Sequence, residues 1–197
     1  PPPPPPPPAE SGDVVLWAGR ATTFAGGWTP VADGTAAGGQ AMLHPDAGAA
    51  KISTALALPQ HYFELTFNAE AGKPYRLWLR GRAERDYWGN DSVHVQFSDS
   101  VDDGGLPRWR IESTSSLEVN LEDGSGAGLL GWGWQDNGYG AGVLGPLVRF
   151  ETTGVHTIRV QTREDGFRID QIVLSPATYL NSAPGALKND TTILPGS

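Results

Sequence analysis

The stretch Gly154-Val-His-Thr-Ile-Arg-Val-Gln-Thr-Arg-Glu-Asp-Gly-Phe-Arg-Ile-Asp-Gln-Ile-Val-Leu174 is the part of the sequence that decides the fold. It contains two segments, 155–160 and 167–174, that are rich in β-branched and apolar residues and therefore favour β-strands. Glu164-Asp-Gly166 lies between them, and Asp-Gly is the strongest short signal of a tight hairpin turn. The stretch predicts two consecutive strands joined by this turn.

Further strands are predicted on the N-terminal side of this stretch. Short segments of β-rich or alternating composition, separated by turns, occupy residues 13–17, 22–24, 40–43, 62–67, 75–80, 92–97, 108–111, 132–134 and 147–151. No run of ten or more residues carries apolar residues at helical spacing, so almost no helix is expected. About nine to eleven short strands predict an all-β sandwich or barrel over residues 13–176.

Alternation assigns side chains to opposite faces of the predicted sheets. In Tyr75-Arg-Leu-Trp-Leu-Arg80 the tyrosine and both leucines share one face, and both arginines and the tryptophan share the other. In Ser92-Val-His-Val-Gln-Phe97 the valines and the phenylalanine point inward. Asp170 interrupts the apolar pattern of its strand, so its carboxylate needs a metal ion or a cationic partner, such as an arginine of residues 76–82.

Composition excludes several classes of function. The 197-residue chain has a formal net charge of −8 and no cluster of Lys and Arg, which argues against a nucleic-acid partner. No segment approaches the roughly 20 apolar residues that span a bilayer, so membrane insertion is not expected. Without cysteine there are no thiolate sites, and no serine-hydrolase, zinc-protease or nucleotide-binding motif occurs. The sequence predicts a protein that is not an enzyme.

The two ends of the chain differ from the middle. Pro1 to Pro8 predict a polyproline II segment, assigned to residues 1–12, which serves as a linker or as an arm for self-association. Residues 177–197 are polar and irregular, and are expected either to strap across the fold or to form a linker.

Together, four segments resemble a known family pattern: 74–82, Asn90-Asp-Ser-Val-His-Val-Gln-Phe97, Gly131-Trp-Gly-Trp134 and 154–174. Their order and spacing resemble the galactose-binding-like jelly-roll β-sandwich of carbohydrate-binding modules in the broad group of families 6 and 35. The resemblance covers about residues 13–176. It implies a non-catalytic module of a secreted or cell-surface protein that binds a polysaccharide or other glycan.

The resemblance also concerns a metal. Modules of this group often hold a structural calcium ion through acidic residues of the first strand and an Asp near the last strand. Asp170 matches the latter, whereas the first strand reads Val14-Val-Leu-Trp-Ala-Gly19 and lacks the usual Glu residues. Asp170 is therefore the one candidate ligand for a structural Ca²⁺.

Aromatic residues near polar side chains are the candidate glycan contacts, because an indole covers the C–H face of a sugar while amides and carboxylates bind its hydroxyls. The first cluster is Trp88 with Asn90, in a turn between two strong strands. The second contains Trp134, Asp136, Asn137 and Tyr139. Two lone tryptophans complete the set: Trp109, flanked by arginines, and Trp28, in a Gly-rich loop.

Two other functions compete with glycan binding. A structural domain, such as a subunit of an extracellular fibre or surface layer, would use the polyproline arm for assembly. A small glycoside hydrolase would need a carboxylate pair such as Glu112 and Glu118, but a pair is expected by chance among 22 acidic residues.

Overall fold

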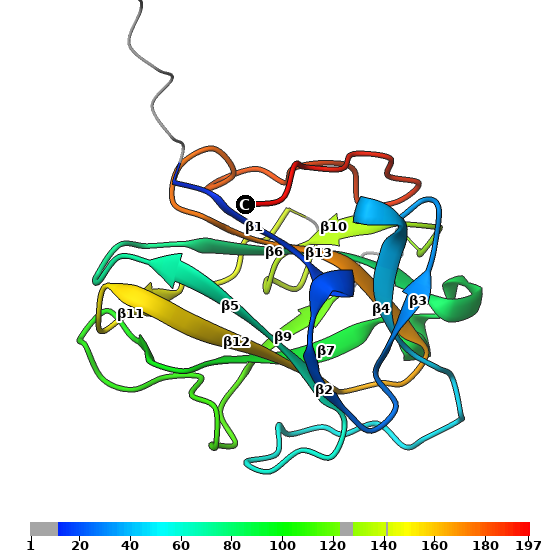
Figure 1. The fold of residues 1–197 in the computed structure, drawn as a ribbon, viewed down its shortest axis with the longest axis horizontal. Helices are drawn as coiled ribbons and strands as arrows, with labels where there is room; N and C mark the ends of the chain where they lie inside the picture. Colours follow the sequence, from blue (N-terminus) through cyan, green and yellow to red (C-terminus); the bar gives the residue numbers. More distant parts are fainter. Residues whose placement is uncertain (1–11, 123–127, 141) are drawn as a thin grey trace, which may run out of the picture.

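The computed structural model describes residues 12–122, 128–140 and 142–197, and the polyproline segment lies outside them (Figure 1). The strands are β1 (Val14–Trp17), β2 (Thr23–Ala25), β3 (Thr29–Ala32), β4 (Gln40–His44), β5 (Tyr62–Ala69), β6 (Arg76–Ala83), β7 (Ser92–Phe97), β8 (Ser100–Val101), β9 (Leu117–Asn120), β10 (Gly133–Gln135), β11 (Arg149–Phe150), β12 (Gly154–Thr162) and β13 (Phe167–Ser175). Four short 3₁₀ turns accompany them: η1 (Ala18–Arg20), η2 (Ala37–Gly39), η3 (Glu84–Asp86) and η4 (Trp88–Asn90). Over the described ranges, no helix has the length and apolar character required to cross a membrane.

The strands form two antiparallel sheets that pack face to face, as Figure 1 shows. The first sheet has the order β10-β6-β13-β4-β3, with β1 paired to β13, and the second has the order β2-β5-β12-β7-β9. Strands β8 and β11 form a small separate pair. The layers and the long connections between sheets confirm the predicted all-β jelly-roll sandwich.

The predicted hairpin at residues 164–166 is wrong. Strand β12 pairs with β5 and β7 in the second sheet, whereas β13 pairs with β1, β4 and β6 in the first. The turn at Gly166, with φ of 73°, therefore carries the chain from one layer to the other. Asp-Gly supplies the local reversal, but the sandwich decides which strands pair.

The core lies between the two sheets. Leu77 and Leu79 of β6 and Val93, Val95 and Phe97 of β7 are fully buried there, which confirms the inward faces predicted from alternation. Each fully buried large apolar side chain stabilises the fold by about 1.5–3 kcal/mol relative to exposure. The sandwich is a rigid platform for the loops at its ends and edges.

A segment without regular structure covers the outer face of the first sheet. Residues 177–197, which we call the C-terminal strap, run across this face (red in Figure 1). The indole N–H of Trp78 donates to the carbonyl of Tyr179 at 2.7 Å, and that of Trp17 to the carbonyl of Leu194 at 3.1 Å. Trp78 and Trp134 form a second apolar cluster beneath the strap. On the outward face of β6, Arg76, Trp78 and Arg80 are therefore also buried, whereas Arg82 is exposed.

Some predicted elements differ from the structure. Residues 108–111 contain no strand, because Trp109 has a left-handed φ of 51° that interrupts an extended chain. Strands β3, β8 and β9 were not predicted. Of these, β8 is only two residues long, and β3 contains Pro30, which is tolerated because β3 is at the sheet edge.

Candidate functional site

The loop between β6 and β7 presents the most exposed tryptophan of the described chain. Trp88 is 61% exposed and Tyr87 is 44% exposed, with their ring centroids 5.1 Å apart and their planes inclined by 51°. Two neighbouring aromatic rings expose apolar surface to water, and a bound ligand would bury part of it. The position of Trp88 at a loop surface is as the sequence predicted.

The backbone of this loop is held in an uncommon conformation. Arg85 and Asp86 are consecutive non-glycine residues with φ of 62° and 49°. Such left-handed residues cost about 1–2 kcal/mol each and persist where surrounding contacts fix them. Here the N–H of Glu84 donates to the carbonyl of Gly166 at 2.7 Å, and the N–H of Gly131 donates to Asp86 Oδ1 at 2.8 Å. These contacts fix how the aromatic pair is presented.

Asn90 anchors the loop between β6 and β7, which we call the Trp88 loop. It is 3% exposed, and its Nδ2 donates to Asp46 Oδ2 at 3.0 Å. The burial of Asn90 and its bond to Asp46 argue against the predicted contact with ligand. The residue instead ties the Trp88 loop to the segment after β4.

A pocket of about 410 Å³ opens beside the start of this loop, and we call it the loop-end pocket. Its lining residues are Asp46, Arg82, Ala83, Glu84, Arg85 and Arg168. Arg85 pairs with Asp46, and Arg168 pairs with Asp33. Glu84 Oε2 accepts the N–H of Asp46 at 2.8 Å. The wall thus alternates guanidinium donors with carboxylate acceptors, which suits a polyhydroxylated ligand.

A buried pair of carboxyl groups lies where the same loop enters β7. Asp91 is fully buried, and burial, assisted by the neighbouring charges of Glu164 and Glu122, raises the pKa of Asp91 to about 8. Burial alone would raise the pKa of Glu164 as well. However, its bonds to Ser92 Oγ (2.5 Å) and Lys51 Nζ (2.9 Å), with the charge of Arg163, hold that pKa below its usual value. Asp91 is therefore the protonated member of the pair at neutral pH.

The variant Asp91→Asn is expected to remove a pH dependence of stability. The pKa of Asp91 is raised from 3.8 to about 8 in the folded state. Between these two pH values the folded chain keeps the proton on Asp91, whereas the unfolded chain has lost it. Wild-type stability therefore falls as the pH rises through about 8, by at most about 1.4 kcal/mol per pH unit. Urea unfolding from about pH 6 to about pH 9 tests this. Identical pH profiles for the two proteins would contradict it.

Two members of the second predicted cluster are buried. Trp134 is 1% exposed and packs under the strap, so it cannot offer a ring face to a sugar. Asp136 is also 1% exposed: its Oδ1 accepts the N–H of Gly138 at 2.9 Å, and its Oδ2 accepts that of Gly145 at 2.8 Å. The burial of both side chains argues against the predicted ligand contacts, and the bonds of Asp136 instead hold the loop after β10.

The other predicted residues, Trp109, Asn137 and Tyr139, come together at the edge of the sandwich. They line a cleft of about 540 Å³, which we call the edge cleft. Tyr139 is 60% exposed, whereas Trp109 is buried with the Arg108 guanidinium 3.9 Å from its ring centroid. The arginine over the ring and the burial of Trp109 argue against its predicted stacking role.

Sequence reasoning assigned no role to four polar residues of the edge cleft, Lys51, Ser116, Asn120 and Arg163, and named Glu118 only as a possible partner of Glu112. The alternation of Leu117-Glu-Val-Asn120 was a usable signal, because it places two polar side chains on one face of a short strand. Lys51 and Arg163 carried no such local signal, since they lie in loops far apart in the sequence.

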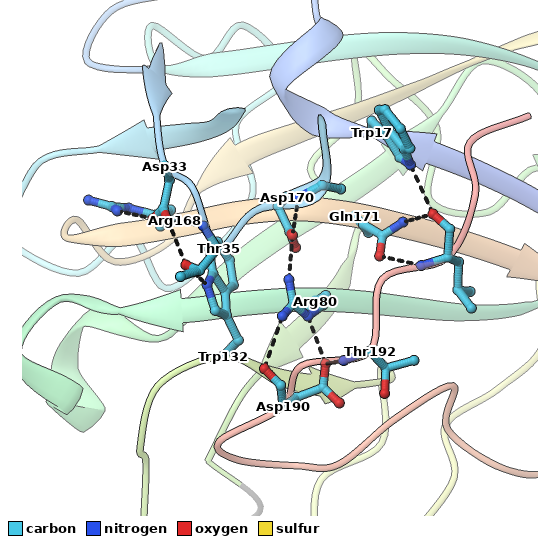
Figure 2. Close-up of polar contacts among 12 residues, drawn as sticks. Trp17, Asp33, Thr35, Arg80, Trp132, Arg168, Asp170, Gln171, Asp190 and Thr192 are labelled. Carbon is cyan, nitrogen blue, oxygen red and sulfur yellow. Dashed lines mark hydrogen bonds and ion pairs between the residues drawn. The ribbon is translucent and has the colours of Figure 1, made fainter. Parts of the chain in front are cut away.

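Asp170, the candidate calcium ligand, binds an arginine instead. Its Oδ2 accepts from the Arg80 guanidinium and from the N–H of Ala37 at 2.9 Å. Figure 2 shows Arg80 between Asp170 and Asp190 of the strap. Calcium requires six to eight oxygen ligands, and no group of three metal-ligating side chains occurs among the described residues. The residues present do not fit the ion, and the calcium prediction is corrected to an ion pair.

Comparison with known proteins gives a structural likeness only. No protein-family model matches the sequence, and no curated protein matches it. The structure is similar to a GH26-CBM35 β-(1,4)-mannanase from Podospora anserina, with a TM-score of 0.50 and 16% identity, over 86% of this chain and 28% of that protein. This chain thus spans about a quarter of the mannanase.

Two isolated modules also match, at lower TM-scores. One is a family 35 carbohydrate-binding module from Clostridium thermocellum, with a TM-score of 0.45 and 14% identity, over 82% of this chain and 97% of the module. The other is the C-terminal CBM6 of a laminarinase from Zobellia galactanivorans, with a TM-score of 0.46 and 10% identity, over 83% and 98%. The likeness to the mannanase and the sheet topology together show that the chain has the jelly-roll fold expected from its resemblance to carbohydrate-binding modules.

Proposed function

We propose that this chain is a non-catalytic carbohydrate-binding module that binds glycan at the loop-end pocket and the adjoining Trp88 loop. The observation that carries the proposal is the exposed Tyr87–Trp88 pair on the loop whose first residues line the pocket. The fold shared with a mannanase that contains a carbohydrate-binding module supports the same reading.

The geometry suits a passive binding mechanism. A sugar ring stacked on an exposed indole gains about 0.5–1.5 kcal/mol beyond the burial of area. The guanidinium of Arg82 has no hydrogen bond or ion pair among the described residues, so it is available to hydroxyl groups. Arg85 and Arg168 are already neutralised by carboxylates, which favours neutral sugars at this pocket.

The pocket lacks the arrangement of a glycoside hydrolase. Hydrolysis needs one carboxyl group as acid and a second as base or nucleophile, both facing the substrate. Asp46 Oδ2 already accepts from Asn90 and pairs with Arg85, and Glu84 Oε2 accepts a backbone N–H. These carboxylates hold the loops together, which favours binding without chemistry. We place the module in a larger secreted or cell-surface protein, where repeated weak contacts raise the overall affinity.

The variant Trp88→Ala is expected to weaken binding to the preferred neutral polysaccharide about tenfold or more, because it removes the stacking surface. A glycan array would identify the polysaccharide, and isothermal titration would measure the affinity. Trp88→Phe should retain most of it, because a ring remains. Leu58→Ala is the matched control, since Leu58 is 82% exposed and lies outside the pocket. Equal affinities of Trp88→Ala and wild type would sink the proposal.

A further inference from the structure

The edge cleft carries a local positive charge on an acidic protein. The chain has a net charge of −8, yet the cleft is lined by the cations Lys51, Arg108 and Arg163 and by a single carboxylate, Glu118. Cations gathered in a concave site raise the local concentration of anions. The charge of this cleft is thus opposite to that of the whole chain.

One of these cations has no counter-ion. Lys51 Nζ lies 2.9 Å from Glu164 Oε1, and Arg163 Nε lies 3.1 Å from Glu118 Oε2. The guanidinium of Arg108 makes no ion pair or hydrogen bond within the described part of the chain. It lies over the ring of Trp109, 3.9 Å from the ring centroid. Because the contact with the ring uses the face of the guanidinium and leaves its N–H groups unpaired, these groups are free to bind an oxyanion.

Neutral groups of the cleft add the features that a sugar requires. Tyr139 offers an exposed ring, and Asn120 offers an amide. Asn137 Nδ2 donates to the carbonyl of Pro146 at 3.0 Å, whereas its Oδ1 is buried with no partner among the described residues. A buried acceptor without a partner is costly. Because this oxygen has no exposed surface, Asn137 shapes the wall of the cleft and does not offer Oδ1 to a ligand.

We propose that the edge cleft is a second glycan site, selective for sugars that carry a carboxylate or sulfate group. Arg108 binds the oxyanion, Tyr139 stacks on the ring, and Asn120 binds hydroxyl groups. The inference builds on the proposed function, but it uses none of the residues of the loop-end pocket. The two sites differ in charge balance, because the three arginines of the loop-end pocket lie among the carboxylates of Asp46 and Glu84 and the Asp33 that pairs with Arg168, whereas the three cations of the edge cleft share one lining carboxylate.

The test compares oligogalacturonate with its methyl ester, in which each carboxylate becomes a neutral ester, by isothermal titration. A sulfated galactan oligosaccharide forms the third arm and separates sulfate from carboxylate recognition. Wild type is expected to bind at least one of the two anionic sugars about tenfold or more tightly than the methyl ester, with an affinity that falls as salt is added. Failure of both anionic sugars to bind overturns the proposal.

Variants locate the site. Arg108→Gln is expected to reduce anionic-sugar affinity about tenfold, and Tyr139→Ala several-fold, whereas Arg108→Lys retains part of it. Arg20→Gln is the matched control, because Arg20 also lies over a tryptophan, 4.1 Å from the Trp17 ring, but outside the cleft. Trp88→Ala should leave anionic binding unchanged, so failure of the loop-end pocket is distinguishable. Arg108→Gln that binds as wild type overturns the assignment.

Discussion

Deletion of residues 177–197 is expected to remove most of the stability of the fold, with a loss of at least about 5 kcal/mol in the free energy of unfolding. The deletion exposes the Trp78 and Trp134 cluster and leaves Arg80 without Asp190. Losing one partner of a buried ion pair costs about 3–5 kcal/mol, and each uncovered large apolar side chain about 1.5–3 kcal/mol. Domains of ordinary size have only about 5–15 kcal/mol in total.

Urea or thermal unfolding followed by tryptophan fluorescence measures this loss, because the strap contacts Trp17, Trp78 and Trp134. A synthetic peptide of residues 177–197 should restore part of the stability when added to the truncated chain, because it supplies the same contacts. An unrelated peptide of equal charge serves as the control. A truncated chain with unchanged stability would show that the strap is dispensable.

The strap explains why the sequence predicted the burial of the inward face of β6 but not the burial of its outward face. Alternation in β6 separates its two faces correctly, since it depends only on the geometry of an extended chain. It cannot reveal that Trp78 and Arg80 on the other face are also buried, at 3% and 1% exposure. That burial comes from residues about 100 positions away, in a segment with no periodic pattern.

The tryptophans show the same limit for the candidate site. Trp28 and Trp88 both lie in Gly-containing loops, and both were predicted to be exposed. Trp88 is exposed, but Trp28 is 1% exposed because it packs against Phe63 and His44, with ring centroids 5.0 and 5.6 Å away. Local sequence identifies a loop, whereas tertiary contacts decide whether a large side chain in it folds inward.

The edge cleft could be predicted only in part for a related reason. Asn137 and Tyr139 were identified because aromatic and amide residues adjoin in the sequence. Lys51 and Arg163 are brought there by a loop contact, in which the N–H of Ile52 donates to the carbonyl of Arg163 at 2.8 Å. Residues in or next to strands of both sheets line the edge cleft, so predicting the cleft requires knowledge of the sheet topology. The hairpin predicted at residues 164–166 did not give this topology, because it joined two strands that belong to different sheets.

Arg80→Ala is expected to destabilise the protein by about 3–5 kcal/mol, because it leaves the buried carboxylates of Asp170 and Asp190 without their shared cation (Figure 2). The guanidinium also lies 4.8 Å from the Trp132 ring centroid, so some packing is lost as well. Arg80→Met keeps most of the volume and isolates the loss of charge. Urea unfolding at neutral pH measures both variants, and a loss below about 1 kcal/mol for Arg80→Met would contradict the importance of the ion pair.

The pH dependence separates charge from packing. Burial raises the pKa of Asp170 to about 6, while Arg80 opposes this rise, so removal of Arg80 raises the pKa further. A carboxyl group whose folded-state pKa is raised contributes stability below its unfolded pKa, and this contribution is lost as the pH rises through the folded value. The penalty of Arg80→Met should therefore be smaller at about pH 5 than at about pH 8. Substitution of Asp170 and Asp190 by Asn in the Arg80→Met background should recover part of the loss at pH 8, because no buried charge remains unpaired. A penalty that stays constant with pH and persists in this triple variant would assign the role of Arg80 to packing alone.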